Sequence, residues 1–414
     1  MSKVKTVTLG CRFNFYESEV AKSMIENIAP ETDVILINTC AVTHEAERQS
    51  KQAVRKAIRK AGNAKVIVTG CAVKSANDYF KTLSEIEIIE NEEKSEIGVY
   101  ADRLGIKEYR NGGIDSVIDE DNELFKNRAR AFLQIQNGCD NFCTYCIVPY
   151  TRGRCKSLPL DVIINRINHL TSIGFKEVVL SGIDITSYGK DMSDMTLSTV
   201  ITEILKRTNL ERIRISSLDP AGIDDKLLNI ITDEPRIMPH IHLSIQSGDN
   251  NVLRSMRRRH TREDVIKLCN NIQDSRNDVV FGSDFIAGFP TETEEMLKNT
   301  IKLIKEANLT LNHIFPYSPR TGTPASKMIQ LPTKIITDRA KMLREVTETQ
   351  KEKLYQFLIG RTITGMIERN ENGISYGKTD SFIPFIIKGI YNPEHILKIT
   401  VTGYNENGLE VSII

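Results

Sequence analysis

The sequence predicts an α/β protein in three parts: an N-terminal parallel α/β sheet domain, a central (βα)6 partial barrel of the TIM type, and a small C-terminal β-barrel. Short apolar stretches alternate with helical patterns over most of the chain, which is typical of parallel sheets. In the central region this alternation repeats six times. The final segment instead holds short β-rich runs that are separated by turn residues.

Length and composition set the broad class. The chain has 414 residues, too many for one ordinary core, so two or three domains are expected. A net charge of +1 neither requires nor excludes nucleic acid as a partner. The sequence begins without the pattern of a secretory signal, and no apolar run reaches the about 18 residues of a membrane helix. We therefore expect a cytoplasmic protein, in which eight cysteines indicate metal or redox chemistry more than disulfides.

Three strand patterns near the N-terminus each end at a cysteine. The strands are expected at residues 4–10, 33–39 and 65–70, and the cysteines are Cys11, Cys40 and Cys71. The carboxyl ends of parallel strands meet at one edge of a sheet, so these side chains are predicted to converge. The alternative is three buried structural cysteines. A charged stretch with a Gly-Gly pair at 92–128 indicates the end of this domain and a linker.

The central region carries the six strand patterns of the predicted barrel. They lie at residues 130–136, 177–183, 212–218, 240–246, 278–288 and 311–318. Polar residues follow these strands, and in a βα barrel that rim carries the active site. We expect domains at 1–125, 126–350 and 351–414.

The loop after the first of these strands contains the spacing C-x3-C-x2-C, formed by Cys139, Cys143 and Cys146. A structural zinc site needs four closed ligands. Three thiolates on a four-iron cluster instead leave one iron open to a substrate or cofactor. The alternative is zinc with Cys155 as the fourth ligand, whereas Cys269 lies in a helical pattern and is expected in the core.

This spacing, after the first strand of a six-unit βα domain, resembles the radical S-adenosylmethionine (radical SAM) enzymes. The resemblance implies that the open iron binds the amino and carboxylate groups of S-adenosylmethionine. An electron from the cluster then cleaves the cofactor to a 5′-deoxyadenosyl radical. The cofactor carries the difficult chemistry, and the protein positions and tunes it.

Further motifs resemble the methylthiotransferases within that superfamily. They include TLGCRFNFYESE, INTCAVTHEAERQSKQAVRK, QNGCDNFCTYCIVPYTRGR, DFIAGFPTETEE and FPYSPRTGTPASKM. Related branches modify N6-isopentenyladenosine in tRNA, an aspartate of a ribosomal protein, or N6-threonylcarbamoyladenosine in tRNA. The motifs most resemble the last, the MtaB branch.

The resemblance assigns roles to both cysteine trios. Cys139, Cys143 and Cys146 would hold the [4Fe–4S] cluster that binds and reduces S-adenosylmethionine. The trio at the N-terminal strand ends would hold a second, auxiliary [4Fe–4S] cluster that carries the sulfur to be transferred. The product would be a methylthio group on C2 of the modified adenine, next to the anticodon of tRNA. An electron donor such as flavodoxin or ferredoxin would be a partner.

Six residues at or after strand ends are candidates for contact with S-adenosylmethionine. They are Ser181, Gly182, Asp184, Ser217, Gln246 and Arg254. The first three occupy the strand end where the superfamily meets the methionine amino group. Loop capping is the alternative role for all of them.

RNA contact is expected from a basic stretch and from the C-terminal domain. Residues 254–262 hold five arginines and one histidine, a density that suits phosphate contact or a solvated helix start. The C-terminal β-barrel resembles the TRAM domain, an RNA-binding appendage of this family. Its aromatic residues Tyr376, Phe382 and Phe385 would contact RNA or fill the core. The non-enzyme alternative for the whole chain is a zinc-stabilised RNA-binding protein.

Overall fold

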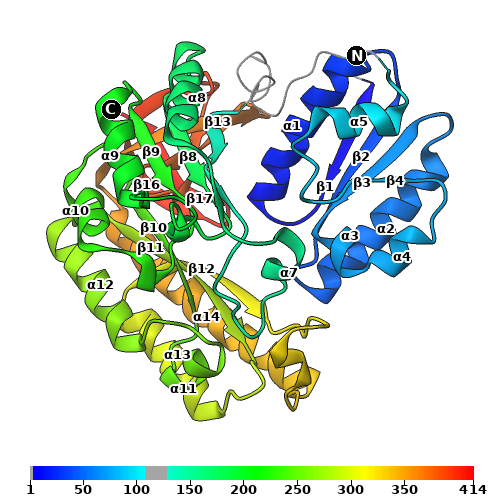
Figure 1. The fold of residues 1–414 in the computed structure, drawn as a ribbon. Helices are drawn as coiled ribbons and strands as arrows, with labels where there is room; N and C mark the ends of the chain where they lie inside the picture. The colour runs from blue at the N-terminus through cyan, green and yellow to red at the C-terminus, as the bar shows by residue number, and fades with distance from the viewer. Residues whose placement is uncertain (1–2, 108–127) are drawn as a thin grey trace. The chain divides into compact units, whose positions relative to one another are not determined.

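The computed structural model describes residues 3–107 and 128–414 (Figure 1). The chain forms two compact units. In the described residues, unit 1 contains the region up to residue 107 together with residues 136–156 and 318–327. Unit 2 contains residues 128–135, 157–317 and 328–414. The linker predicted at 92–128 lies mostly outside the described residues, although α5 (Ile97–Leu104) occupies its beginning.

Unit 1 is built on a parallel four-stranded sheet in the order β1-β2-β3-β4. The strands are β1 (Val4–Thr8), β2 (Val34–Thr39), β3 (Lys65–Gly70) and β4 (Glu87–Ile88). The first three confirm the strands expected from the sequence, and β4 is too short to have been recognised. Helices α1 (Arg12–Ile28) and α5 cover one face of the sheet, and helices α2 (His44–Lys60), α3 (Cys71–Ser75) and α4 (Asn77–Lys81) cover the other (Figure 1).

The sheet of unit 1 is apolar because both of its faces are covered. Leu36, Ile37 and Val68 are fully buried, as expected for parallel strands between helices. Helix α2 begins where the Thr43 hydroxyl accepts a hydrogen bond from the backbone N–H of Ala46. Such a cap satisfies one of the donors that the first turn of a helix leaves open.

Unit 2 contains the six predicted strands of the partial barrel, all parallel within their sheets. They are β5 (Ala131–Gln134), β8 (Glu177–Ser181), β9 (Arg212–Ile215), β10 (His240–Gln246), β11 (Val280–Ala287) and β12 (Leu309–Pro316). They form two three-stranded sheets, β5-β8-β9 and β10-β11-β12. Two isolated bridges, Ile213–Ile237 and Leu218–Leu243, connect these sheets into one curved run.

Helices separate the barrel strands along the chain and lie on the outside of the curved run (Figure 1). They are α8 (Leu160–Ser172), α9 (Leu197–Arg207), α10 (Asp225–Asp233), α11 (Asn250–Ser255), α12 (Arg262–Ser275) and α13 (Glu294–Glu306). The long helix α14 (Thr333–Leu358) packs against β11 and β12 and leads to the last part of the chain. Among the described residues, no helix has the length and apolar character that crossing a membrane requires.

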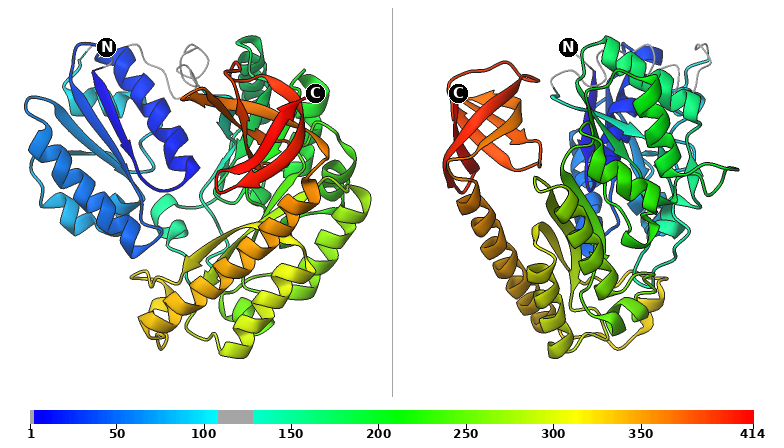
Figure 2. Two further views of the ribbon diagram at one scale, coloured as in Figure 1. Left: turned by 180° about the vertical axis from the view of Figure 1, so that it is seen from behind. Right: turned by 90° about the vertical axis from the view of Figure 1, so that its left-hand side faces the viewer.

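The C-terminal part of unit 2 is a closed barrel of five strands at one end of α14 (Figure 2). The strands are β13 (Thr362–Glu371), β14 (Ile374–Thr379), β15 (Pro384–Lys388), β16 (Ile396–Asn405) and β17 (Gly408–Ile413). Phe385 fills the barrel core and is 1% exposed. A Cβ on Gly365 or Gly377 would lie 2.4 Å from the Phe385 ring, so both neighbours must be glycine. Of the two roles considered for Phe385, the core role is therefore the one observed.

The barrel is fastened to the βα strands by the ring of Phe382. This ring stacks on His240 with the centroids 5.2 Å apart, and the Arg214 guanidinium lies 4.6 Å from its centre. Phe382 has a φ of 68°, so its backbone is in the left-handed region. The side chain thus has a docking role within unit 2.

Candidate functional site

The structure places Cys11, Cys40 and Cys71 at the same edge of the unit 1 sheet. Cys11 is the N-cap residue of α1, Cys40 directly follows β2, and Cys71 begins α3 directly after β3. Cys11 is exposed, whereas Cys40 and Cys71 are buried. Burial raises the pKa of the Cys40 thiol to about 11, and the neighbouring thiols of Cys71 and Cys11 act in the same direction. The three sulfur atoms therefore lie close enough to influence one another's charge, as the strand pattern predicted.

Glycine precedes two of these cysteines because no side chain fits there. Gly10 has a φ of +94°, and a Cβ on it would lie 2.5 Å from the sulfur of Cys40. Gly70 has a φ of +101°, and its Cβ would lie 2.4 Å from the carbonyl oxygen of Thr39. Glycine thus allows the strand ends to approach each other closely at this edge.

Asn14 fixes two of these strand ends to each other. Its amide nitrogen donates to the carbonyl oxygens of Leu9 and Thr39 at 2.8 and 2.9 Å. Its amide oxygen lies 3.9 Å from the sulfur of Cys11 and accepts a hydrogen bond of 2.6 Å from Arg152. A residue of α1 therefore positions both the Cys11 and the Cys40 loops.

Cys139, Cys143 and Cys146 also belong to unit 1. Their loop is closed at its base, where the N–H of Cys139 donates to the carbonyl oxygen of Gly153 at 3.1 Å. Gly138 allows this closure, because a Cβ on it would lie 1.8 Å from the carbonyl oxygen of Arg154. Cys143 is buried, and the other two cysteines are partly exposed. Both cysteine trios are thus held in one compact unit.

The segment 318–327 completes this unit. The N–H of Ala325 donates to the carbonyl oxygen of Thr144 at 2.8 Å, between two cysteines of the loop. Arg320 forms an ion pair with Glu47 on α2. The sequence motif FPYSPRTGTPASKM therefore has a structural role in supporting both cysteine-bearing regions.

The two remaining cysteines are both buried. The side-chain nitrogen of Gln136 donates to the sulfur of Cys155 at 3.4 Å, and also to the carbonyl oxygen of Gly138 at 2.8 Å. Cys155 therefore takes part in fixing the base of the loop. Burial raises the pKa of Cys269 on α12 to about 12, which confirms its expected place in the core.

The six residues expected to contact S-adenosylmethionine all lie in unit 2. Ser181 is the last residue of β8, Gln246 ends β10 with a φ of 76°, and Ser217 is partly exposed after β9. Beside Ser217, the buried hydroxyl of Ser216 has no hydrogen-bond partner among the described residues.

Asp184 and Arg254 already have local partners. The carboxylate of Asp184 accepts hydrogen bonds from the hydroxyls of Thr186 and Ser187, at 2.7 and 2.5 Å. Arg254 donates to the side chain of Asn251 in its own helix at 3.0 Å. The loop-capping role is thus present for Asp184, whereas Arg254 bonds within its own helix, and the contact of both with the cofactor stays a prediction.

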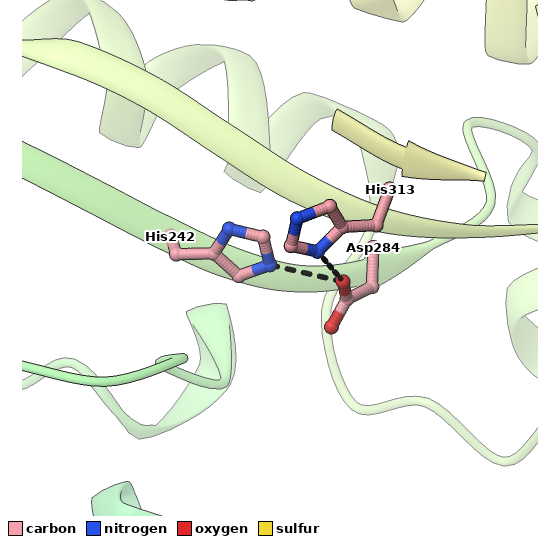
Figure 3. A group of neighbouring side chains, drawn as sticks. All are labelled: His242, Asp284 and His313. Atoms are coloured by element: carbon pink, nitrogen blue, oxygen red, sulfur yellow. Dashed lines mark hydrogen bonds and ion pairs between the residues drawn. The ribbon is translucent and has the colours of Figure 1, made fainter. Parts of the chain in front are cut away.

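Three side chains that the sequence did not indicate meet in the partial βα barrel of unit 2 (Figure 3). His242, Asp284 and His313 come from the adjacent strands β10, β11 and β12. One carboxylate oxygen of Asp284 lies 3.0 Å from Nε2 of His242 and 3.1 Å from Nδ1 of His313. Burial acts to raise the pKa of Asp284, but its hydrogen bonds with the two histidines outweigh burial and lower it.

This trio has the donor atoms of a transition-metal site, and the three atoms lie within 4.8 Å of one another. The two hydrogen bonds also account for the geometry without an ion. His242 is buried, whereas the side chain of His313 is 64% exposed. The trio therefore presents one imidazole, fixed by a carboxylate, on the open side of the strands. The trio could be predicted from the sequence only if the register of its three strands were known.

The basic stretch 254–262 is less available for phosphate contact than its composition indicates. Arg258 and Arg259 both donate to the carboxylate of Asp219, at 3.0 and 2.9 Å. Burial acts to raise the pKa of Asp219, but its hydrogen bond with His260 and its arginine partners lower it. Two of the five arginines are therefore engaged in holding the loop after β9, and phosphate contact by the stretch stays a prediction.

Comparisons with known proteins identify the family of this chain. Residues 133–304 match the model of the radical SAM superfamily, and residues 3–90 match the family described as "Uncharacterized protein family UPF0004". The threonylcarbamoyladenosine tRNA methylthiotransferase MtaB of Rickettsia prowazekii is 41% identical over 420 residues, which cover 99% of this chain and 97% of that protein. The chain belongs to the MtaB family of radical SAM methylthiotransferases.

Other similar proteins are consistent with this family. The tRNA-2-methylthio-N(6)-dimethylallyladenosine synthase of Ehrlichia chaffeensis is 31% identical over 386 residues, which cover 88% of this chain and 87% of that protein. The solved structure of the radical SAM methyltransferase TsrM from Kitasatospora setae shares the fold, with a TM-score of 0.53 and 14% identity over 91% of this chain and 81% of that chain. Because it belongs to this family, the protein is an enzyme, and a [4Fe–4S] cluster and S-adenosylmethionine are implied as its cofactors.

Proposed function

We propose that this enzyme adds a methylthio group to C2 of N6-threonylcarbamoyladenosine next to the anticodon of tRNA. The observation that carries the proposal is the near full-length similarity to a relative named for that nucleoside. It is supported by two separate cysteine trios in one compact unit. One trio serves a radical SAM enzyme of any kind, and the second supplies what sulfur transfer additionally requires.

Both trios fit [4Fe–4S] clusters better than zinc. In a tetrahedral zinc site, thiolate ligands about 2.3 Å from the metal lie about 3.8 Å apart. Among the described residues, only His242, Asp284 and His313 bring three ligand atoms within 4.8 Å of one another. Each cysteine trio instead supplies three thiolates, one fewer than the four ligands of a structural zinc site. Three thiolates support a four-iron cluster at each trio, with one iron that no residue of the trio coordinates.

When bound, the clusters and S-adenosylmethionine supply the radical and the sulfur. The residues of the chain hold and orient these groups. We assign Cys139, Cys143 and Cys146 to the cluster that binds S-adenosylmethionine, and Cys11, Cys40 and Cys71 to the auxiliary cluster. Ser181, Gly182, Asp184, Ser217, Gln246 and Arg254 are the proposed contacts to S-adenosylmethionine.

The remaining parts of the proposal concern partners and organisation. The tRNA anticodon loop presents single-stranded bases that a pocket can take up at little cost. The five-stranded C-terminal barrel, whose fold matches the expectation, is proposed as a TRAM-like RNA-binding domain at 351–414. An N-terminal methylthiotransferase domain at 1–125 and a radical SAM domain at 126–350 precede it. A cytoplasmic location and a flavodoxin or ferredoxin as electron donor complete the proposal.

A second candidate is methylthio transfer to N6-isopentenyladenosine in tRNA. It is favoured by the relative from Ehrlichia chaffeensis, which is named for the dimethylallyl nucleoside and matches 88% of this chain. Its lower identity, 31% against 41%, makes it the second choice.

Mass spectrometry of tRNA nucleosides distinguishes these candidates. We expect a strain that lacks the gene to lose the methylthio form of threonylcarbamoyladenosine and to keep that of isopentenyladenosine. The wild-type gene should restore the lost nucleoside, and a Cys11→Ala gene expressed at the same level should not. Loss of the isopentenyl product instead would replace the first candidate by the second. No change in either nucleoside would contradict both.

A further inference from the structure

Three charged side chains are buried together beside the Cys11, Cys40 and Cys71 trio. Glu17 on α1 accepts two hydrogen bonds from the guanidinium of Arg152, at 2.9 and 3.0 Å. The same carboxylate accepts from the ammonium group of Lys94 at 2.5 Å. The side chains of Arg152, Glu17 and Lys94 are 1%, 7% and 6% exposed. Such groups are almost never fully buried unless they are paired.

The charges of this group do not balance. Its members, all described residues, are two cations and one carboxylate. An excess buried charge is strongly unfavourable, because burial removes its hydration. Burial lowers the pKa of Lys94, and the neighbouring guanidinium of Arg152 acts in the same direction, against the carboxylate of Glu17. The arrangement is therefore incomplete without a further anion.

Hydrogen bonds lead from both cations to the cysteine sulfurs. Arg152 donates to the amide oxygen of Asn14, which lies 3.9 Å from the sulfur of Cys11. Lys94 donates to the amide oxygen of Asn91 at 2.8 Å. The amide nitrogen of Asn91 is 3.8 Å from the sulfur of Cys71. Each cation is thus one amide group away from a cysteine of the trio.

Arg152 also connects the two cysteine trios along the chain. It is the last residue of the short helix α7 (Val148–Arg152), which begins two residues after Cys146. Helix α7 packs against α3, whose first residue is Cys71. Asn91 strengthens this contact, because its amide nitrogen also donates to the carbonyl oxygen of Thr151 at 2.7 Å.

A three-thiolate iron–sulfur cluster has the missing charge. Three thiolates around an oxidised [4Fe–4S] core of about +2 leave a net charge of about −1, which matches the excess of the buried group. We propose that Arg152 is a positioning residue that, with Lys94, supplies the counter-charge for the cluster at Cys11, Cys40 and Cys71 and raises its reduction potential. This inference rests on the auxiliary cluster of the proposed function. A nearby cation favours the reduced state, which carries one more negative charge.

The test uses the full chain with Cys139, Cys143 and Cys146 changed to alanine, so that one cluster remains. Arg152→Gln removes the charge and leaves the balanced Glu17–Lys94 pair, so the variant is expected to fold. Arg152→Lys keeps the charge. Arg154→Gln is the matched control, because Arg154 is two residues away with a side chain that is 73% exposed. After anaerobic reconstitution, iron content, melting temperature and the reduction midpoint by spectroscopic titration are measured.

We expect Arg152→Gln to shift the ratio of reduced to oxidised cluster at a fixed potential at least tenfold toward the oxidised form. For one electron this is a midpoint about 59 mV lower. Arg152→Lys should shift it less, and Arg154→Gln should leave it unchanged. Equal midpoints for Arg152→Gln and Arg154→Gln, or equal shifts for the glutamine and lysine variants, would overturn the inference.

Two further outcomes are separable. If the parent chain binds no iron at all, the proposed function fails, and the inference that rests on its auxiliary cluster is overturned with it. If Arg152→Gln folds with the melting temperature of the control but retains no iron, the need for the cation is supported.

Lys94→Gln provides a second measurement that leaves the balanced Glu17–Arg152 pair. A lowered midpoint in Lys94→Gln supports the inference, and an unchanged one, with full iron content, contradicts it.

Discussion

Two buried charge clusters in this protein differ in one respect that explains their roles. In unit 2, Glu177 is fully buried and accepts from Arg130, Arg212 and Arg214 at 2.6, 2.9 and 2.8 Å. Two carboxylates of the C-terminal barrel complete this cluster, because Glu368 pairs with Arg130 and Asp380 pairs with Arg212. Its three cations therefore face three carboxylates. The cluster around Glu17 in unit 1 has two cations and one carboxylate.

The two clusters show how a structural ion cluster differs from one that needs a ligand to balance its charge. The Glu177 cluster is complete within the protein, and it fastens the C-terminal barrel to strands β5, β8 and β9. The Glu17 cluster is complete only with an anion beside it, and the residues next to it are cysteines. Charge balance, rather than burial, separates the two cases.

Breaking the balanced cluster should have the largest effect. Glu177→Gln leaves three buried guanidinium groups with only the two carboxylates at the edge of the cluster. Removing one partner of a buried pair costs about 3–5 kcal/mol, and we expect that loss in the free energy of unfolding of unit 2 by urea denaturation. A loss below about 1 kcal/mol would show that the cluster is not structural.

In the chain without an iron–sulfur cluster, the unbalanced Glu17 charge cluster should lose more stability when its carboxylate is removed than when a cation is removed. Glu17→Gln leaves two buried cations together, and we expect it to lower the free energy of unfolding by about 3 kcal/mol. Arg152→Gln removes the excess charge instead, and the loss should be about 1 kcal/mol, the size of the lost hydrogen bonds. Urea denaturation of the two variants side by side measures this difference. Equal losses of unfolding free energy in the two variants would contradict an excess of positive charge in this cluster.

Acid should weaken the balanced cluster within a defined range of pH. Burial acts to raise the pKa of Glu177, but its arginine partners lower it from 4.5 to about 2. A carboxylate whose pKa is lower in the folded state stabilises the protein above its unfolded pKa, and this contribution is lost as the pH falls toward the folded value. We therefore expect the stability difference between wild type and Glu177→Gln to be constant above pH 4.5 and to shrink between pH 4.5 and about 2. A difference that does not change with pH would contradict this assignment.

The His242–Asp284–His313 trio gives the smallest predicted effect on stability. Its two partners are imidazoles, and each shares one hydrogen bond with the carboxylate. Asp284→Asn keeps one acceptor, and we expect a loss of about 1 kcal/mol in the free energy of unfolding. Methylthio transfer measured on the same variant shows whether the exposed imidazole of His313 also serves the reaction. A loss as large as that of Glu177→Gln would place the trio among the structural clusters.

The sequence predicted what is local and repeated. Each strand of the partial barrel is a short apolar stretch beside a helical pattern, so its period is visible without tertiary information. The position of Cys11, Cys40 and Cys71 follows from the rule that parallel strands end at one edge. The short strand β4 has two residues and gives no pattern.

Long-range charge pairing could not be predicted in this way. Arg152 and Glu17 are 135 residues apart, and Arg212 and Asp380 are 168 residues apart. Arg258 and Arg259 look like a surface patch in the sequence, because their partner Asp219 lies 39 and 40 residues earlier. Only the folded chain shows which charged residues are buried and whether their charges balance.

Iron and acid-labile sulfide analysis of the anaerobically reconstituted full chain tests the central claim most directly. Two trios of cysteines, each holding a [4Fe–4S] cluster, predict about eight irons per wild-type chain and about four in a variant that lacks Cys11, Cys40 and Cys71. A wild-type chain with only about four irons, or a variant that still holds about eight, would contradict the account.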